Sequence, residues 1–164
     1  MKLTIKQVEV RDIGPSLQLV RRFFAEEGPE NRYPVIDDEE LDQLGMAMLS
    51  SLNSPSSLYL IAYDGKKPTG VFIGEVIQRT YGKPRVFGVA RDLYVVPEKR
   101  GQGVGTKLMA TALYYARALG LTYIEAIARP GKLQTKWEKY GFKPYLINSS
   151  MSIEAAPVFK HEKS

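Results

Sequence analysis

The chain has 164 residues, 44% of them hydrophobic and 25% charged, which indicates one globular domain and excludes a disordered or fibrous protein. It has no cysteine and a single histidine, His161, so disulfides, thiol nucleophiles and zinc–thiolate sites are excluded, and we expect neither a histidine triad nor a metal site. The net charge of +5 raises nucleic acid as a partner, but residues 1–56 carry six Lys and Arg against ten Asp and Glu, whereas residues 57–164 carry 17 against eight.

The first part of the chain predicts one strand and two helices. Residues 1–10 alternate apolar and polar side chains, as a half-buried strand does. Residues 16–27 place apolar side chains on one helical stripe, and the dipeptide that begins at Gly28 ends this helix. A second helix begins at Asp37 with acidic residues in its first turn and continues to Leu52.

The second part predicts more strands than helices. Three strands are expected at 57–63, 70–79 and 85–96, and the turn residues between them predict antiparallel hairpins. The long segment 103–119 is the strongest predicted helix, and Gly120 follows it as a helix-ending glycine. The remaining short elements are a strand at 122–128, a helix at 133–140 and strands at 142–147 and 149–154.

This order of elements predicts a mixed sheet with helices packed against it, of α/β or α+β class. Residues 1–154 are expected to form one domain, and 155–164 a loose polar tail. No apolar run reaches the ~20 residues of a membrane span, and the N-terminus lacks a secretion signal. We therefore expect a soluble, cytoplasmic protein with no membrane partner.

The segment 92–109 carries the clearest chemical signal. A strand runs into a loop with glycines at 101, 103 and 105, and a helix begins at once. Glycines let a backbone approach a ligand closely, and the first N–H groups of a helix attract anions such as phosphate. Lys99, Arg100 and Lys107 add positive charge around this loop.

Two common phosphate loops do not fit this segment. The Walker pattern requires Gly-Lys-Ser/Thr, but the order here is Gly105-Thr106-Lys107. The dinucleotide pattern fails because Thr106 or Leu108 stands at its third glycine, depending on the register. The segment does match R-x-x-G-x-G from Arg100 to Gly105, and Gly141-Phe142 adds a second match further on. With these motifs the chain resembles the GNAT superfamily of N-acetyltransferases, and in particular its small bacterial-type members.

The resemblance implies a GNAT fold, with a mostly antiparallel twisted sheet and about four helices, that uses acetyl-CoA as cosubstrate without a metal. In such proteins a β-bulge separates two strands, so that the pantetheine arm pairs with one of them and a backbone N–H, here that of Val95, faces the thioester carbonyl. The cofactor-binding residues it implies are Leu93, Tyr94, Val95, Arg100, Gly101, Gln102, Gly103, Val104, Gly105, Thr106 and Trp137.

The resemblance also implies a catalytic base and a catalytic acid. Glu125 lies where a glutamate serves as base in the ribosomal-protein branch of the superfamily, although an exposed strand residue is an equal alternative. The usual acid is a tyrosine four residues before the glycine of Gly-Phe, but Trp137 occupies that position here, and indole cannot release a proton at useful pH. Tyr140 is the replacement that we predict, with a purely structural role as its alternative; Asp92 and Tyr94 are reserves.

The predicted function is transfer of acetyl from acetyl-CoA to a primary amine, on a small molecule or a protein. The alternative is a GNAT-fold protein that binds acyl-CoA with weak or no transferase activity, because the usual tyrosine is missing. A basic nucleic-acid-binding module is a third, less favoured reading of the charge. The acceptor is expected at the acidic segment 26–38. The sequence leaves its identity open, as well as whether the base acts directly or through water and whether the chain forms a homodimer.

Overall fold

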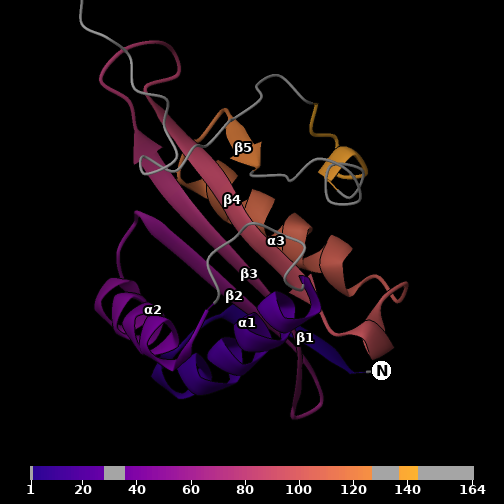
Figure 1. Ribbon diagram of the computed structural model, residues 1–164. Helices are drawn as coiled ribbons and strands as arrows, with labels where there is room; N and C mark the ends of the chain where they lie inside the picture. Colours follow the sequence, from indigo (N-terminus) through magenta and orange to yellow (C-terminus); the bar gives the residue numbers. More distant parts are fainter. Residues whose placement is uncertain (1, 28–35, 127–136, 144–164) are drawn as a thin grey trace, which may run out of the picture.

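The computed structural model of the protein describes residues 2–27, 36–126 and 137–143. In this part of the chain, five strands form one sheet, three α-helices pack on it, and two short 3-10 turns (Val10–Asp12 and Pro97–Lys99) connect elements (Figure 1). The strands and helices, in chain order, are β1 (Leu3–Gln7), α1 (Ile13–Glu27), α2 (Asp38–Ser51), β2 (Ser57–Asp64), β3 (Lys67–Gln78), β4 (Val86–Val95), α3 (Val104–Ala118) and β5 (Ile124–Ala126).

The sheet follows the order of the sequence, β1-β2-β3-β4-β5. The first four strands pair antiparallel with their neighbours, and β5 pairs parallel with β4 because α3 carries the chain back across the sheet between them. This arrangement confirms the mixed, mostly antiparallel sheet and the hairpins expected from the turn residues. Three α-helices lie in the described residues, fewer than the four expected, because half of the helix predicted at 133–140 lies outside them.

The helices cover both faces of the sheet (Figure 1). On one face α1 and α2 bury Leu19, Leu41 and Met48 against sheet residues that include Val71. On the other face α3 buries Leu108 and its neighbours against the opposite side chains of the same strands. A fully buried side chain of this kind stabilises the fold by roughly 1.5–3 kcal/mol, so the two apolar stripes hold the three layers together.

A β-bulge in β4 divides this strand into two parts. Ile73 of β3 pairs with Asp92 and Gly74 pairs with Ala90, so Arg91 is the extra residue. Before the bulge, Ala90 packs on the α3 side of the sheet; after it, Tyr94 packs on the α1 side. The bulge therefore reverses which residues of β4 face each side, and it lies at the last residue pair between β4 and β5, Ala90 with Ala126.

The helix ends agree closely with the local sequence signals. The side chain of Asp37 caps α2 by accepting the backbone N–H of Glu40 at 3.0 Å. Gly120 has φ +73°, as expected of a glycine that follows a helix. Helix α1 begins at Ile13, three residues before the predicted start. The strands predicted at 142–147 and 149–154 and the tail from 155 lie at or beyond the limit of the described residues.

Candidate active site

The second half of β4 has one edge without a partner strand among the described residues. The N–H of Gly88 donates to Tyr123 on the β5 side, whereas the N–H of Val96 donates to Thr69 on the β3 side, each at 3.0 Å. Backbone groups alternate along a strand, so the N–H groups of Leu93 and Val95 point away from β3. We call this part of β4, residues 92–95, the open edge. It is the site that the sequence analysis assigned to the pantetheine arm.

The glycine loop leads from this edge to the start of α3. Gly101 and Gly103 have φ values of +76° and +82°, conformations that L side chains rarely adopt, and Gly103 caps α3 without a side-chain hydrogen bond. The first intrahelical bond of α3 runs from the N–H of Lys107 to the carbonyl of Gly103 at 3.0 Å. The N–H groups of the preceding first turn have no partner within the helix and are available for an anion.

The loop is exposed, whereas the helix behind it is anchored. Gly101, Gln102, Gly103 and Thr106 are exposed, and Val104 is buried under the sheet. A side-chain atom added at Gly101 or Gly103 would meet nothing within 4 Å among the described residues. The surface in front of the first turn of α3 is therefore clear, as a phosphate site requires.

Tyr140 brings a hydroxyl group to the same corner. Its oxygen lies 2.9 Å from the position of a Cβ atom built on Gly105, and the side chain of Val95 lies 3.6 Å from that position. The ring of Tyr140 is half-buried and packs against Trp137, which is 7% exposed in the core on the α3 side. The structure thus brings Tyr140 to the glycine loop and the open edge, and places Trp137 in the core behind it.

The side chain of Arg100 turns away from the glycine loop toward α1. Its Nε donates to the carbonyl of Val95 at 2.9 Å, and its guanidinium donates to Glu26 near the end of α1. The Tyr94 hydroxyl donates to the same carboxylate, and the guanidinium lies 5.7 Å from the Tyr94 ring centre. Arg100 therefore joins α1 to the open edge of β4, instead of adding charge to the loop as the sequence suggested.

These contacts set the protonation of Glu26 and Tyr94. Burial by itself would raise the pKa of Glu26, but hydrogen bonds from Tyr94 and Arg100 hold this pKa below its ordinary value. Burial and the hydrogen bond to Glu26 raise the pKa of Tyr94 to about 12. Tyr94 is thus a poor proton donor at neutral pH, which weakens its case as a reserve acid.

The other basic residues near the loop differ in how they are used. Lys99 forms an ion pair with Asp64 at 2.6 Å. Lys107 is exposed and forms no ion pair with any residue that the structure describes. Of the three basic residues noted around the loop, Lys107 is the one whose charge the described residues do not already neutralise.

Glu125 lies on β5 on the opposite face of the sheet from α3. Its neighbours Ile124 and Ala126 pack in the core on the α3 side, so Glu125 faces the side covered by α1 and α2. Its carboxylate accepts a hydrogen bond from Arg79 at the end of β3. The guanidinium of Arg79 lies 4.0 Å from the centre of the Phe87 ring, which fixes its position.

Sequence reasoning did not identify Arg79 as a functional residue. It appeared only as the last residue of a predicted strand, 46 positions from Glu125. The signal that could have found it is the register: Ile77 pairs with Phe87 and Val89 pairs with Glu125, which brings the end of β3 near β5. Most of the expected acceptor segment, residues 28–35, lies outside the described residues.

A family comparison identifies this arrangement. The model of the acetyltransferase (GNAT) domain matches residues 55–144, which is more than half of the chain and includes the open edge, the glycine loop and Tyr140. The chain belongs to the GNAT acetyltransferase family. None of the curated protein sequences matches the chain.

Solved structures of other GNAT proteins share the fold. A predicted acetyltransferase with acetyl-CoA from Clostridium acetobutylicum has a TM-score of 0.79 at 17% identity, covering 94% of this chain and 98% of that one. Glucosamine-6-phosphate N-acetyltransferase from Arabidopsis thaliana has a TM-score of 0.70 at 15% identity, covering 93% and 99%. An aminoglycoside acetyltransferase from an uncultured soil metagenomic sample has a TM-score of 0.67 at 22% identity, covering 92% and 96%.

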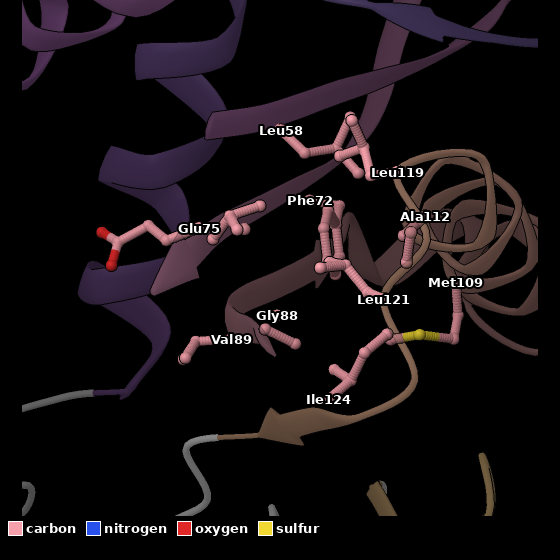
Figure 2. A pocket seen from close by; sticks show the side chains of 14 residues that line it. Leu58, Phe72, Glu75, Gly88, Val89, Met109, Ala112, Leu119, Leu121 and Ile124 are labelled. Atoms are coloured by element: carbon pink, nitrogen blue, oxygen red, sulfur yellow. The ribbon is translucent and has the colours of Figure 1, made fainter. Parts of the chain in front are cut away.

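The GNAT domain also contains an apolar cavity of about 40 Å³ between α3 and the sheet (Figure 2). Phe72, Gly74, Gly88, Met109 and Ile124 are among its lining residues, and the carboxylate of Glu75 points away from it (Figure 2). The cavity is far too small for a coenzyme, and its lining is almost entirely apolar. The glycine loop and the open edge remain the better candidate site.

The described residues give two further findings, on membrane-spanning helices and on metal ligands. No described helix is long and apolar enough to cross a lipid bilayer. No three acidic or histidine side chains in the described part of the chain are grouped closely enough to hold a metal ion.

Proposed function

We propose that this GNAT protein transfers the acetyl group of acetyl-CoA to a primary amine by direct attack, without a covalent enzyme intermediate. The observation that carries the proposal is the junction of two backbone features. Gly103 and Thr106 leave the start of α3 exposed, and the open edge of β4 runs from the bulge to Val95, whose side chain lies 3.6 Å from a Cβ built on Gly105. Phosphate chemistry and thioester chemistry thus have adjacent sites.

The first turn of α3 supplies the phosphate site. The N–H groups of Val104, Gly105 and Thr106 carry the positive end of the helix dipole, and the positive φ values at Gly101 and Gly103 expose them. Lys107 adds a charge that no described carboxylate neutralises. These groups suit the pyrophosphate of coenzyme A.

The open edge supplies the site for the pantetheine arm and the thioester. An extended chain that contains amides pairs with the free backbone groups of a strand edge as an added strand does. The backbone N–H groups of Leu93 and Val95 face that side. The N–H of Val95 then donates to the thioester carbonyl oxygen, which becomes negative during attack. One such preorganised donor is worth about 2.7–4 kcal/mol in other acyl-transfer sites.

Two side chains handle the protons. A primary amine with a lysine-like pKa of ~10.4 is protonated at neutral pH, so it must lose a proton before its nitrogen attacks the carbonyl carbon. Glu125 receives this proton, directly or through water. The C–S bond breaks as the amide forms, Tyr140 gives a proton to the departing thiolate, and the second proton lost by the nitrogen restores the Tyr140 hydroxyl. Support for these roles comes from the place of Glu125 on β5, which pairs with β4 just before the bulge, and from the Tyr140 hydroxyl beside Gly105.

Glu125→Gln is expected to lower kcat by about 100-fold at neutral pH and to leave the KM for acetyl-CoA nearly unchanged, because it removes the base and leaves the glycine loop intact. The loss should shrink toward pH 10, where the amine deprotonates without help. Steady-state kinetics from pH 7 to 10 measure both effects.

Glu75→Gln is the matched control for this experiment. Glu75 and Glu125 lie on the two sides of Val89, on the same face of the sheet. Glu75 also forms an ion pair with an arginine, Arg91, at 2.7 Å. Glu75→Gln should change kcat far less than Glu125→Gln. Equal effects of the two variants, or unchanged turnover in Glu125→Gln, would remove Glu125 from the role of base.

The acceptor is proposed to be the amine of a small molecule, with a protein amine as the wider class. The names of two structural neighbours, a glucosamine-6-phosphate N-acetyltransferase and an aminoglycoside acetyltransferase, support small amines. The acidic segment 26–38 remains the proposed place of the acceptor. A cytoplasmic location and a single domain over 1–154 remain part of the proposal, and a homodimer remains open.

The second candidate function is binding of acyl-CoA with weak or no transfer. The observation that favours it is Trp137, a buried residue at the usual position of the acid. Both functions predict that coenzyme A raises the unfolding temperature, so this measurement does not separate them. They differ in turnover. Release of thiol from acetyl-CoA in the presence of amines distinguishes them.

A further inference from the structure

The backbone conformation at Gly105 does not require a glycine. It is the second residue of α3 and, unlike Gly101 and Gly103, it does not have a positive φ. A glycine inside a helix destabilises it by roughly 0.5–1 kcal/mol relative to alanine. Something other than conformation must therefore exclude a side chain here.

The neighbouring atoms show what excludes it. Apart from the chain neighbours of Gly105 and the backbone of its own helix, two described atoms lie within 4 Å of a Cβ built there, the Tyr140 hydroxyl oxygen at 2.9 Å and a methyl carbon of Val95 at 3.6 Å. The second distance is an ordinary contact, whereas the first is too short for a carbon and an oxygen that are not bonded. The hydroxyl of Tyr140 therefore occupies the space that an alanine methyl group would need.

Tyr140 cannot easily move its hydroxyl elsewhere. Its N–H donates to the carbonyl of Trp137 at 2.9 Å, and its ring meets the indole edge to face, with ring centres 6.4 Å apart. Trp137 is itself held in the core and packs on Phe142 at 5.3 Å. Because a tyrosine ring is rigid, moving the oxygen requires moving the ring out of this packing.

We infer that Gly105 is a positioning residue that seats the hydroxyl of Tyr140 at the corner of α3 and the open edge of β4. In this chain the second glycine of R-x-x-G-x-G, Gly105, is required by Tyr140, and not by the phosphate. The inference rests on the proposed function for its catalytic meaning, because the seat matters to turnover only if Tyr140 protonates the thiolate. The seat itself is a property of the fold.

A double-mutant cycle of Gly105→Ala and Tyr140→Phe tests the seat. Gly105→Ala alone should lower the unfolding temperature and lower kcat by about tenfold, as Tyr140→Phe should. In the Tyr140→Phe background the oxygen is gone and no other described atom but the Val95 methyl lies near. Gly105→Ala should there raise the unfolding temperature, as alanine in a helix does, and change kcat by less than about twofold.

Gly45→Ala serves as the control, because Gly45 lies within α2, where an added Cβ would meet a leucine side chain of α1. Its effect on kcat should be negligible, and its effect on stability the same with and without Tyr140→Phe. The inference is overturned if Gly105→Ala lowers stability or kcat by the same factor in both backgrounds, since the phosphate site would then be the cause. If the wild type shows no turnover, the proposed function fails, and the unfolding temperatures still decide whether the seat exists.

Discussion

Gly103→Glu is expected to abolish the binding of acetyl-CoA. Gly103 is the N-terminal cap of α3, with φ +82° and open space in front of it. A glutamate there would place a side chain and a negative charge where the pyrophosphate is proposed to bind. Its charge would also neutralise the positive end of the helix dipole that attracts the phosphate. A ligand at 100 times its Kd stabilises a protein by about 2.7 kcal/mol, and this gain should disappear. Thermal unfolding with and without coenzyme A measures it.

Gly120→Glu is the matched control for that experiment. Gly120 has a similar positive φ, +73°, and a side chain added there also meets no described atom within 4 Å, but it lies at the opposite end of α3. Both substitutions place a glutamate at a strained positive φ, but the helix dipole favours the negative charge at Gly103 and disfavours it at Gly120, so without ligand Gly120→Glu should be the less stable of the two. Coenzyme A should still stabilise Gly120→Glu. Stabilisation of Gly103→Glu by coenzyme A would contradict the assignment of the phosphate site.

Asp12→Ala is expected to cost about 3–5 kcal/mol of unfolding free energy, because it removes the acceptor of two hydrogen bonds and leaves the half-buried charge of Lys6 with only a 3.7 Å contact to Glu9. Asp12 is 3% exposed and is the last residue of the 3-10 turn between β1 and α1. It accepts hydrogen bonds from Tyr63 at 2.8 Å and from the backbone N–H of Glu9 at 3.0 Å, and Lys6 lies 2.6 Å from its carboxylate. Urea unfolding at pH 7 measures the cost.

The pH dependence gives a second test of this network. Burial would raise the pKa of Asp12, but Lys6, the N–H of Glu9 and Tyr63 together hold it below the ordinary value of 3.8. A lowered pKa means that the stabilisation is present above about pH 4 and is lost as the pH falls through the folded-state pKa. The difference between wild type and Asp12→Ala should therefore shrink below pH 4. Glu9→Ala removes a half-exposed carboxylate from the same place and should cost less than about 1 kcal/mol. An equal cost for the two variants would show that burial of Asp12 does not matter.

The sequence predicted those parts of the molecule that depend on local rules. The strand and helix periods, the cap at Asp37 and the turn at Gly120 depend on residues close in the chain, and the structure agrees with them. The match from Arg100 to Gly105 located the glycine loop for the same reason. The bulge was expected from the resemblance alone, and its position at Arg91 came from the strand register.

Contacts between distant residues could not be read from the chain. Arg79 meets Glu125 only because two strand pairings bring them together. Arg100 appeared to be a phosphate ligand because it is basic and begins the motif, but an ion pair with Glu26, 74 positions away, directs its side chain toward α1. The sequence did not predict where the Tyr140 hydroxyl lies; the structure places it beside Gly105. Long-range packing decides each of these, and no local pattern records it.

The most direct test of the central claim is release of coenzyme A from acetyl-CoA in the presence of primary amines. The purified protein is incubated with acetyl-CoA and single amines, including polyamines, amino sugars, aminoglycosides and a lysine peptide, and free thiol and the acetylated amine are both measured. We predict thiol release that requires an amine, yields the matching N-acetyl product and is absent in Gly103→Glu. Tight binding of coenzyme A with no transfer to any amine would contradict the enzyme and leave the acyl-CoA-binding function. Binding of nucleic acid without any response to coenzyme A would contradict both.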